Sequence, residues 1–269
     1  MCELFGMSAR RPATVHLSLE VFSKHGGLSG PHKDGWGIAW YDERDVRLVK
    51  EARPAADSAC VRFIQDHPFA TPCAISHVRK ATQGAVALRN CQPFVRELGG
   101  AWHTFAHNGN LAGIAAAFPL QPGGPRPIGE TDSEHAFCIL LGRLHALWSG
   151  PGQPSLGARW QVIESFAAAL RGRGPANFLY GDGDALFVHA DRRHQNDGTI
   201  RPPGLWRLNR RCAAGGELAS DGLRIESVGA QQEVALFASV PLTDEGWQPL
   251  ARGDLLVAQR GHIESAAPG

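Results

Sequence analysis

Apolar residues recur at helical spacing in two long segments in the middle of the chain. Residues three, four and seven apart share one face of a helix, so each pattern predicts an amphipathic helix with one buried face. From Thr131 the apolar positions are Phe137, Leu140, Leu141, Leu144, Leu147 and Trp148. From about 157 to 171 they are Trp160, Ile163, Phe166, Ala167 and Leu170. Weaker patterns predict helices near residues 16–24 and 57–66.

Short apolar runs rich in β-formers predict strands on both sides of these helices. The runs are 3–8, 35–42, 46–52, 73–79, 103–108, 177–183, 185–190, 205–209, 233–239 and 254–260. Several are apolar on both faces, as expected of a sheet covered by helices on one side and by a second sheet on the other. Strands, then long helices, then strands do not alternate as in a doubly wound fold. The pattern predicts an α+β fold with layered, antiparallel sheets.

Three Pro- and Gly-rich segments, 119–129, 149–158 and 191–204, read as surface loops rather than domain boundaries. We therefore expect a single domain over residues 1–269. The 43% apolar and 20% charged content is that of a soluble globular protein. A formal net charge of +1 offers no electrostatic reason to expect nucleic acid or an anionic membrane as a partner.

Cysteine usage and targeting signals predict a cytoplasmic protein with reduced thiols. None of the six cysteines forms a C-x-x-C pair, which argues against a structural zinc site or a redox pair. No secretory apolar segment follows Met1, and no apolar run approaches the roughly 18 residues that span a bilayer. The twelve histidines include no H-E-x-x-H motif, so we expect no catalytic metal.

Cys2 stands directly behind the initiator methionine, in the hexapeptide "MCELFG". Chain ends usually fray, so a reactive thiol there is an unusual structural choice. Removal of Met1 would leave a thiol and a free α-amine on one residue, which is a complete pair of nucleophile and base. Their ordinary pKa values, about 8.5 and about 7.7–8.0, make proton transfer between them nearly balanced. On this hexapeptide alone, a cysteine without function remains the alternative.

Two segments at strand ends carry groups suited to substrate binding or catalysis. "SHVRKATQG" (76–84) places Arg79 at the end of a predicted strand and Thr82 in the following turn. An arginine there is either a solvated charge or a bidentate clamp for a carboxylate. "AHNGNL" (106–111) contains Asn108-Gly109, which is either a tight turn or an oxyanion hole made from the Asn amide and the Gly N–H.

The segment "ETDSEHAF" (130–137) begins the first long helix. Thr131 and Glu134 have the spacing of a capping box, which explains both residues without any function. Asp132 falls in the first helical turn, where the helix dipole favours an acid. It remains available to bind an ammonium group.

Cys2, "HVRKATQG", "HNG" and "TDSEH", in this order, resemble the glutaminase domain of class II glutamine amidotransferases. These are N-terminal-nucleophile hydrolases with an αββα sandwich. "GPHKDGWGIAWY" (30–41), "NCQPF" (90–94) and "ASVPLTDEGWQPLARGDLLV" (238–257) are similar to the stand-alone, YafJ-like branch of that family. Each motif is weak by itself, but together they span almost the whole chain. The resemblance implies a four-layer αββα sandwich with two mainly antiparallel sheets between helix layers.

The resemblance also implies roles for the catalytic residues. Cys2, freed of Met1, would be the nucleophile with its α-amine as general base, and Asn108 and Gly109 would form the oxyanion hole. The thiolate attacks the side-chain amide, ammonia leaves, and water hydrolyses the γ-glutamyl thioester. This chemistry needs no metal and no organic cofactor.

For the substrate, the resemblance implies that Arg79 binds the α-carboxylate and Asp132 the α-ammonium, with Thr82 lining the same pocket. Biosynthetic members of the family carry a tryptophan after the arginine and a histidine after the threonine, where this chain has Lys80 and Gln83. A strict preference for free glutamine is therefore not implied. Whether Asp34–Gly37 borders the site, or is only a Gly-rich turn into a core strand, stays open.

Two classes of function follow. The first is an enzyme that cleaves glutamine or another γ-glutamyl amide, and the second is a glutamine-binding or regulatory module that has kept the fold. A binder has no use for a nucleophile or an oxyanion hole, so the set of residues favours the enzyme. The partner is then a small molecule. Since the chain ends at Gly269, we expect either a separate protein that accepts the ammonia or a hydrolase in its own right.

Overall fold

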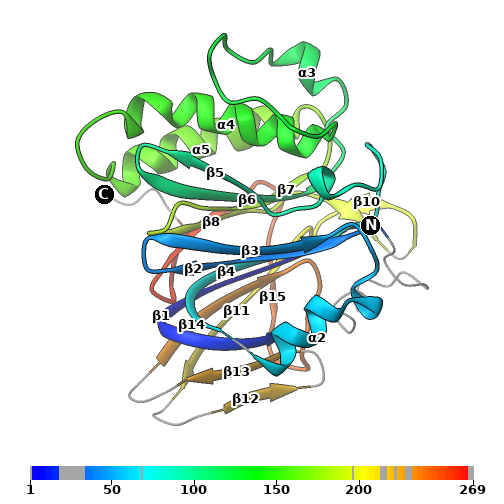
Figure 1. Ribbon diagram of the computed structural model, residues 1–269, viewed down its shortest axis with the longest axis vertical. Coiled ribbons are helices and arrows are strands. Elements are labelled where there is room, and N and C mark those ends of the chain that lie inside the picture. The colour runs from blue at the N-terminus through cyan, green and yellow to red at the C-terminus, as the bar shows by residue number, and fades with distance from the viewer. Residues whose placement is uncertain are drawn as a thin grey trace.

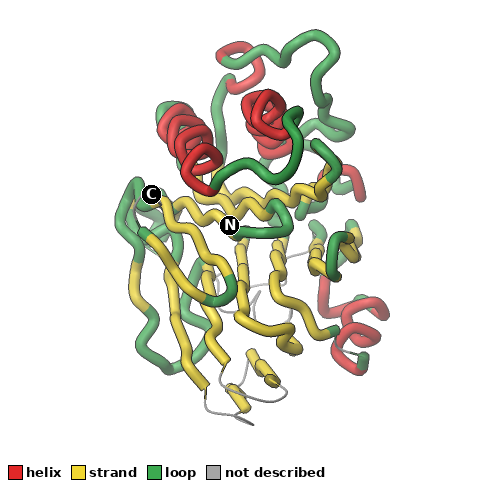
Figure 2. Tube along the Cα trace, turned by 90° about the vertical axis from the view of Figure 1, so that its left-hand side faces the viewer, coloured by secondary structure: helices red, strands yellow, loops and turns green. Residues whose placement is uncertain are grey.

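Two antiparallel sheets lie face to face, and a pair of long helices covers the outer face of one of them (Figures 1 and 2). The computed structural model describes residues 2–17, 34–67, 69–195, 197–212, 217–220, 223–227 and 232–265. Within these ranges, none of the helices has the length and apolar character that a membrane crossing needs.

The first sheet has nine strands, with the order β15-β11-β14-β1-β4-β2-β3 and with β12 and β13 extending it beside β1. Its centre is β1, which pairs with β4 on one side and with β14 and β13 on the other. The strands are β1 (Glu3–Leu17), β2 (Trp36–Asp42), β3 (Asp45–Glu51), β4 (Ala70–Val78), β11 (Trp206–Cys212), β12 (Glu217–Ser220), β13 (Leu223–Ser227), β14 (Gln232–Ala238) and β15 (Gln248–Pro249).

The second sheet has six strands in the order β17-β16-β8-β7-β6-β5. They are β5 (Phe94–Leu98), β6 (Ala101–Gly109), β7 (Ala176–Gly181), β8 (Leu186–His189), β16 (Leu255–Gln259) and β17 (His262–Glu264). A separate two-stranded ribbon consists of β9 (Arg193–His194) and β10 (Ile200–Arg201).

The helices are α2 (Ala59–Asp66), α3 (Ile114–Ala117), α4 (Asp132–Trp148) and α5 (Leu156–Arg171), with two short 3₁₀ helices over Ala55–Asp57 and Leu88–Asn90. The hydroxyl of Thr131 accepts a hydrogen bond from the N–H of Glu134, which starts α4 as the capping motif predicts, but the Glu134 carboxylate accepts from the Gly129 N–H rather than from that of Thr131. Ser155 caps α5 in the same way, through the N–H of Ala158.

Three apolar clusters hold the layers together. Leu4, Ile75 and Leu179 belong to the cluster between the two sheets. Phe105 and Phe137 belong to the cluster under α4 and α5, which cover the second sheet (Figure 1). On the outer face of the first sheet, a third cluster includes Val61 from α2, Met7 and Trp40. The layered α+β architecture predicted from the sequence is confirmed.

Each predicted strand and three of the four predicted helices have counterparts in the structure. The prediction of a helix near residues 16–24 is wrong at its start, because His16 and Leu17 end the long strand β1. Residues 18–24 lie outside the described residues. The expected loop at 191–204 contains β9 and β10, and α5 begins inside the loop expected at 149–158. The short strand β5 was not predicted, because its pairing with β6 rather than its own pattern makes it a strand.

Candidate active site

The beginning of β1 is tied down, in contrast to a typical chain terminus. The carboxylate of Glu3 accepts a hydrogen bond of 2.8 Å from Nη2 of Arg193. Leu4 exchanges two hydrogen bonds of 3.0 Å with Ser239: its N–H donates to the hydroxyl, and its carbonyl accepts from the Ser239 N–H. These contacts join the first residues of β1 to segments more than 180 positions away. Cys2 therefore directly precedes an ordered strand at the centre of the first sheet.

Cys2 lies where the two sheets meet. Its Sγ accepts a hydrogen bond from the Lys80 N–H at 3.2 Å and lies 3.3 Å from the Lys80 carbonyl. Its carbonyl accepts a short hydrogen bond from Nδ2 of Asn108, at the end of β6 in the second sheet. Burial raises the pKa of the Cys2 thiol, an effect that the Lys80 N–H opposes. A thiol with a raised pKa needs a base to react near neutral pH.

Asn108 and Gly109 end β6 beside β7, where they face Asn177 and Ala176. Nδ2 of Asn177 donates a hydrogen bond of 3.2 Å to the Asn108 carbonyl, which holds Asn108 in place. A Cβ built on Gly109 would lie 1.8 Å from the Pro175 carbonyl oxygen, which no real contact allows. Only glycine therefore fits at this position.

Arg79 follows β4, whose last residue Val78 pairs with Glu3. The guanidinium is buried and donates to backbone carbonyls: Nη2 to Gln83 (2.9 Å) and Gly84 (3.2 Å), Nη1 to Ala85 (3.1 Å) and Asp34 (3.4 Å). In this structure it shapes the turn that follows β4. Thr82 is exposed on the same turn. Contact of either residue with a substrate stays a prediction.

Asp132 occupies the first turn of α4 and is half-buried. Its Oδ2 accepts from the Leu111 N–H at 2.7 Å and its Oδ1 from the Ser133 N–H at 2.8 Å. The carboxylate thus ties the start of α4 to the segment that leaves Asn108-Gly109. The side-chain amide of Gln83 also reaches this segment, through Oδ1 of Asn110. The turn after β4, the end of β6 and the start of α4 therefore meet at one place.

Gln92, from the motif "NCQPF", is a site neighbour that the sequence analysis did not single out. Its Oε1 accepts from the His107 N–H at 2.7 Å and its Nε2 donates to the His107 carbonyl at 3.2 Å, so the side chain binds the backbone of β6 directly before Asn108. A Cβ on Gly37 would come within 2.3 Å of the Gln92 carbonyl, which explains the glycine of "GWG". Only the family resemblance offered a signal for this contact.

His107 is buried beneath α4. Its Nδ1 lies 2.9 Å from the Ser133 hydroxyl. Burial lowers the pKa of His107, although nearby Asp132 raises it in part, so the imidazole is neutral near pH 7. It connects β6 to the start of α4 without adding charge.

Asp34 and Gly35, from the segment 34–37, contact the turn that follows β4. Its Oδ2 accepts from the Ala81 N–H at 2.8 Å, and its carbonyl accepts from Arg79. The Gly35 carbonyl accepts from the Arg79 N–H at 2.8 Å. This segment therefore borders the candidate site through the turn that follows β4.

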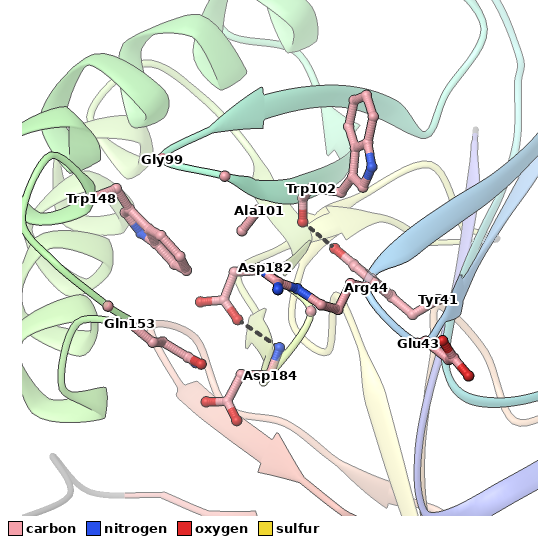
Figure 3. A pocket seen from close by; sticks show the side chains of 13 residues that line it. Tyr41, Glu43, Arg44, Gly99, Ala101, Trp102, Trp148, Gln153, Asp182 and Asp184 are labelled. Atoms are coloured by element: carbon pink, nitrogen blue, oxygen red, sulfur yellow. Dashed lines mark hydrogen bonds between the residues drawn. The ribbon is translucent and has the colours of Figure 1, made fainter.

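A cavity of about 300 Å³ opens beside Asp132, with Gln83, Leu111, Ile114 and His135 among its walls. A larger cavity of about 400 Å³ lies near the other end of β6, between Tyr41, Trp102 and Asp182 (Figure 3). None of the six residues singled out by the sequence lines the larger cavity. The described residues contain no group of three or more His, Cys, Asp or Glu side chains arranged to hold a metal ion.

The comparisons with known proteins agree with this geometry. Glutamine phosphoribosylpyrophosphate amidotransferase from B. subtilis superposes with a TM-score of 0.53 at 17% identity, over 98% of this chain and 49% of that one. Together with the two stacked antiparallel sheets, this defines the fold as the N-terminal-nucleophile type of sandwich.

The sequence profile of the class II glutamine amidotransferases matches residues 1–268. The putative glutamine amidotransferase YafJ of Escherichia coli K12 is 36% identical over 260 residues, 94% of this chain and 96% of that protein. A predicted glutamine amidotransferase from Pseudomonas aeruginosa superposes with a TM-score of 0.73 at 35% identity, over 98% of this chain and all of the other. The chain belongs to the class II glutamine amidotransferases, and so to a family of enzymes that act on the side-chain amide of glutamine.

Proposed function

We propose that the mature protein begins at Cys2, forms one catalytic domain and hydrolyses the side-chain amide of glutamine or of a related γ-glutamyl amide. The observation that carries the proposal is the meeting of Cys2, from the first sheet, with Asn108, from the second. A contact between a cysteine and an amide donor from separate sheets adds little to stability at a chain terminus. Catalysis explains it better, because the reaction needs a nucleophile beside an oxyanion donor.

In the proposed mechanism, the Sγ proton of Cys2 moves to the free α-amine of the same residue. The thiolate attacks the amide carbon, and the carbonyl oxygen becomes an oxyanion that Asn108 Nδ2 and the Gly109 N–H stabilise. The resulting ammonium gives its proton to the leaving nitrogen, the C–N bond breaks, and a γ-glutamyl thioester remains. Water, deprotonated by the α-amine, then releases glutamate and restores the thiol.

Asn108 Nδ2 contacts the Cys2 carbonyl in this structure. On substrate binding we expect this donor to turn toward the oxyanion. We assign the α-ammonium of the substrate to Asp132, which retains acceptor capacity beside its two backbone contacts. We assign the α-carboxylate of the substrate to Arg79 and a position in the wall of the same pocket to Thr82. For Arg79 to bind the carboxylate, its guanidinium must give up hydrogen bonds to the carbonyls of residues 83–85.

The decisive experiment combines intact mass with turnover. Purified protein is assayed for ammonia or amine release from glutamine and a panel of γ-glutamyl amides, and its mass shows whether Met1 is present. Processed protein should be active and should accumulate a mass adduct on Cys2 with an electrophilic glutamine analogue. Cys2→Ala and an unprocessed form should be inactive. Full activity in protein that retains Met1 would contradict the mechanism.

The same panel identifies the physiological role. Release of ammonia from glutamine alone, at a low rate, would favour a separate protein that accepts the ammonia. Faster release of an amine from one conjugate would favour a specialised hydrolase. We place either activity in the cytoplasm, where the thiol of Cys2 stays reduced.

A further inference from the structure

Glu3 and Arg193 form a buried ion pair directly behind the nucleophile. Glu3 is fully buried and Arg193 is 5% exposed. The Glu3 Oε1 accepts from Nη2 of Arg193 at 2.8 Å, and Nη1 of Arg193 donates to the Ser239 carbonyl. A buried ion pair is a poor source of stability, because removing both charges from water costs about as much as their attraction returns. A gain in stability therefore does not explain why this ion pair lies beside Cys2.

The pair is incompletely satisfied. Oε2 of Glu3 and Nε of Arg193 are buried and make no well-formed hydrogen bond among the described residues, although burial raises the pKa of Glu3 and the Ser239 hydroxyl is close enough to lower it in part. A buried carboxylate oxygen without a donor is costly. Removal of Met1 creates one new donor in this part of the molecule, the α-ammonium of Cys2. Chain geometry keeps that nitrogen within about 5 Å of the Glu3 Cα.

Strand alternation decides which group of Cys2 the carboxylate affects more. Adjacent residues of a strand point to opposite faces. Phe5 and Met7 pack in the outer cluster and Leu4 between the sheets, so the Glu3 side chain leaves β1 on the opposite face from that of Cys2. Besides burial, the negative charge of Glu3 contributes to the raised pKa of the Cys2 thiol, but the carboxylate is better placed to act on the α-nitrogen of Cys2 than on its Sγ.

We propose that Glu3, held by Arg193, is a positioning residue that orients the Cys2 α-amine and stabilises the α-ammonium formed when the thiol gives up its proton. The inference rests on the proposed function, since it assigns a partner to the proposed general base. Stabilising the ammonium favours the thiolate–ammonium pair over the neutral pair. Burial raises the pKa of the Cys2 thiol and so opposes that transfer, which makes such support useful.

The other charges around this pair define the test. Arg193 faces Glu3 from β9, Arg79 and Lys80 lie beside Cys2 after β4, and Asp34 contacts the same turn. Removing the negative charge of Glu3 lowers the pKa of a neighbouring ammonium, and removing the positive charge of Arg193 raises it. A purely structural role for the pair predicts no such opposite shifts.

The experiment measures the pH dependence of kcat/KM and of Cys2 alkylation by iodoacetamide, in protein whose mass shows Met1 removed. Glu3→Gln should move the acidic limb of both profiles to lower pH by about one unit and lower kcat roughly tenfold. Arg193→Gln should move the limb to higher pH by a similar amount. Asp182→Asn is the matched control, since it breaks the buried Arg159–Asp182 pair near the other end of the fold and should leave the limb in place.

Folding is checked by thermal unfolding, and the double variant Glu3→Gln/Arg193→Gln is measured if either single variant fails to fold. A folded double variant with about a tenfold lower kcat supports the proposal, and one with wild-type kcat and pH profile overturns it. Unshifted limbs, or limbs shifted in the same direction, in folded single variants also overturn it. If processed wild-type protein hydrolyses no amide, the proposed function fails, and the alkylation profile still tests Glu3.

Discussion

The backbone and the side chain of Asn108 make different contacts, and a substitution can test the side chain separately. Its backbone pairs with β7, and its side-chain amide contacts Cys2. The backbone pairing survives a change of side chain, whereas the amide does not. Substitution therefore tests the chemistry with little effect on the strand.

We expect Asn108→Ala to lower kcat by about a hundredfold or more and to change KM little. In the proposed mechanism the amide contacts the oxygen that gains charge, so it would stabilise mainly the transition state. Steady-state kinetics on the best substrate measures this. A change confined to KM would assign Asn108 to substrate binding instead.

Asp132→Asn should behave in the opposite way. The substitution removes the charge that we assign to the substrate ammonium and keeps the size of the side chain. KM should rise tenfold or more, with a smaller fall in kcat from lost positioning. If Asp132→Asn raised KM equally for a substrate analogue that lacks the α-amine, the assignment of Asp132 to the α-ammonium would be wrong.

At the scale of elements, glycines in β6 and α4 give a matched pair of substitutions. Gly109 abuts the Pro175 carbonyl, whereas a Cβ on Gly142, within α4, meets nothing within 4 Å. The same Gly→Ala change should therefore have opposite effects at the two positions.

Gly142→Ala should stabilise the protein by up to about 1 kcal/mol, the helix propensity difference, with unchanged turnover. Gly109→Ala should destabilise it and lower kcat, because β6 and β7 must separate and the Gly109 N–H moves with them. Urea unfolding and steady-state kinetics measure both. Retained activity in Gly109→Ala would show that this N–H is not an oxyanion donor.

For the whole molecule, buried neutral histidines make stability depend on pH. His189 lies in the second sheet, and burial, with Arg171 beside it, lowers its pKa to about 3. Burial also lowers the pKa of His103 and His107. The unfolded chain protonates each histidine near pH 6.5, whereas the folded protein resists protonation until lower pH. Stability is therefore complete above about pH 6.5 and declines as the pH falls toward 3.

His189→Gln should reduce this acid sensitivity. Between pH 7 and pH 5, the variant should lose about 2 kcal/mol less of its unfolding free energy than the wild type, from about 1.4 kcal/mol per pH unit below pH 6.5. Urea unfolding at the two pH values measures the difference. His262→Gln, at an exposed position, is the control and should lose as much stability as the wild type.

The sequence by itself determined the features that depend on near neighbours. The spacing of Phe137, Leu140 and Leu144 predicted α4, and the capping box predicted where it starts. Helical periodicity and capping act within a few residues, so a linear pattern carries them. The motifs around Cys2, Arg79, Asn108 and Asp132 identified the family for the same reason, since each is a short local signal.

Only the tertiary structure decided how those groups are used. The contact of Cys2 with Asn108 joins residues 106 positions apart, and the Glu3–Arg193 pair joins residues 190 apart. Arg79 could be selected as a cation from the sequence, but its contacts with the carbonyls of residues 83–85 depend on how the turn folds back. Strand pairing and burial bring such groups together, and both are set by the packing of distant segments that no local pattern encodes.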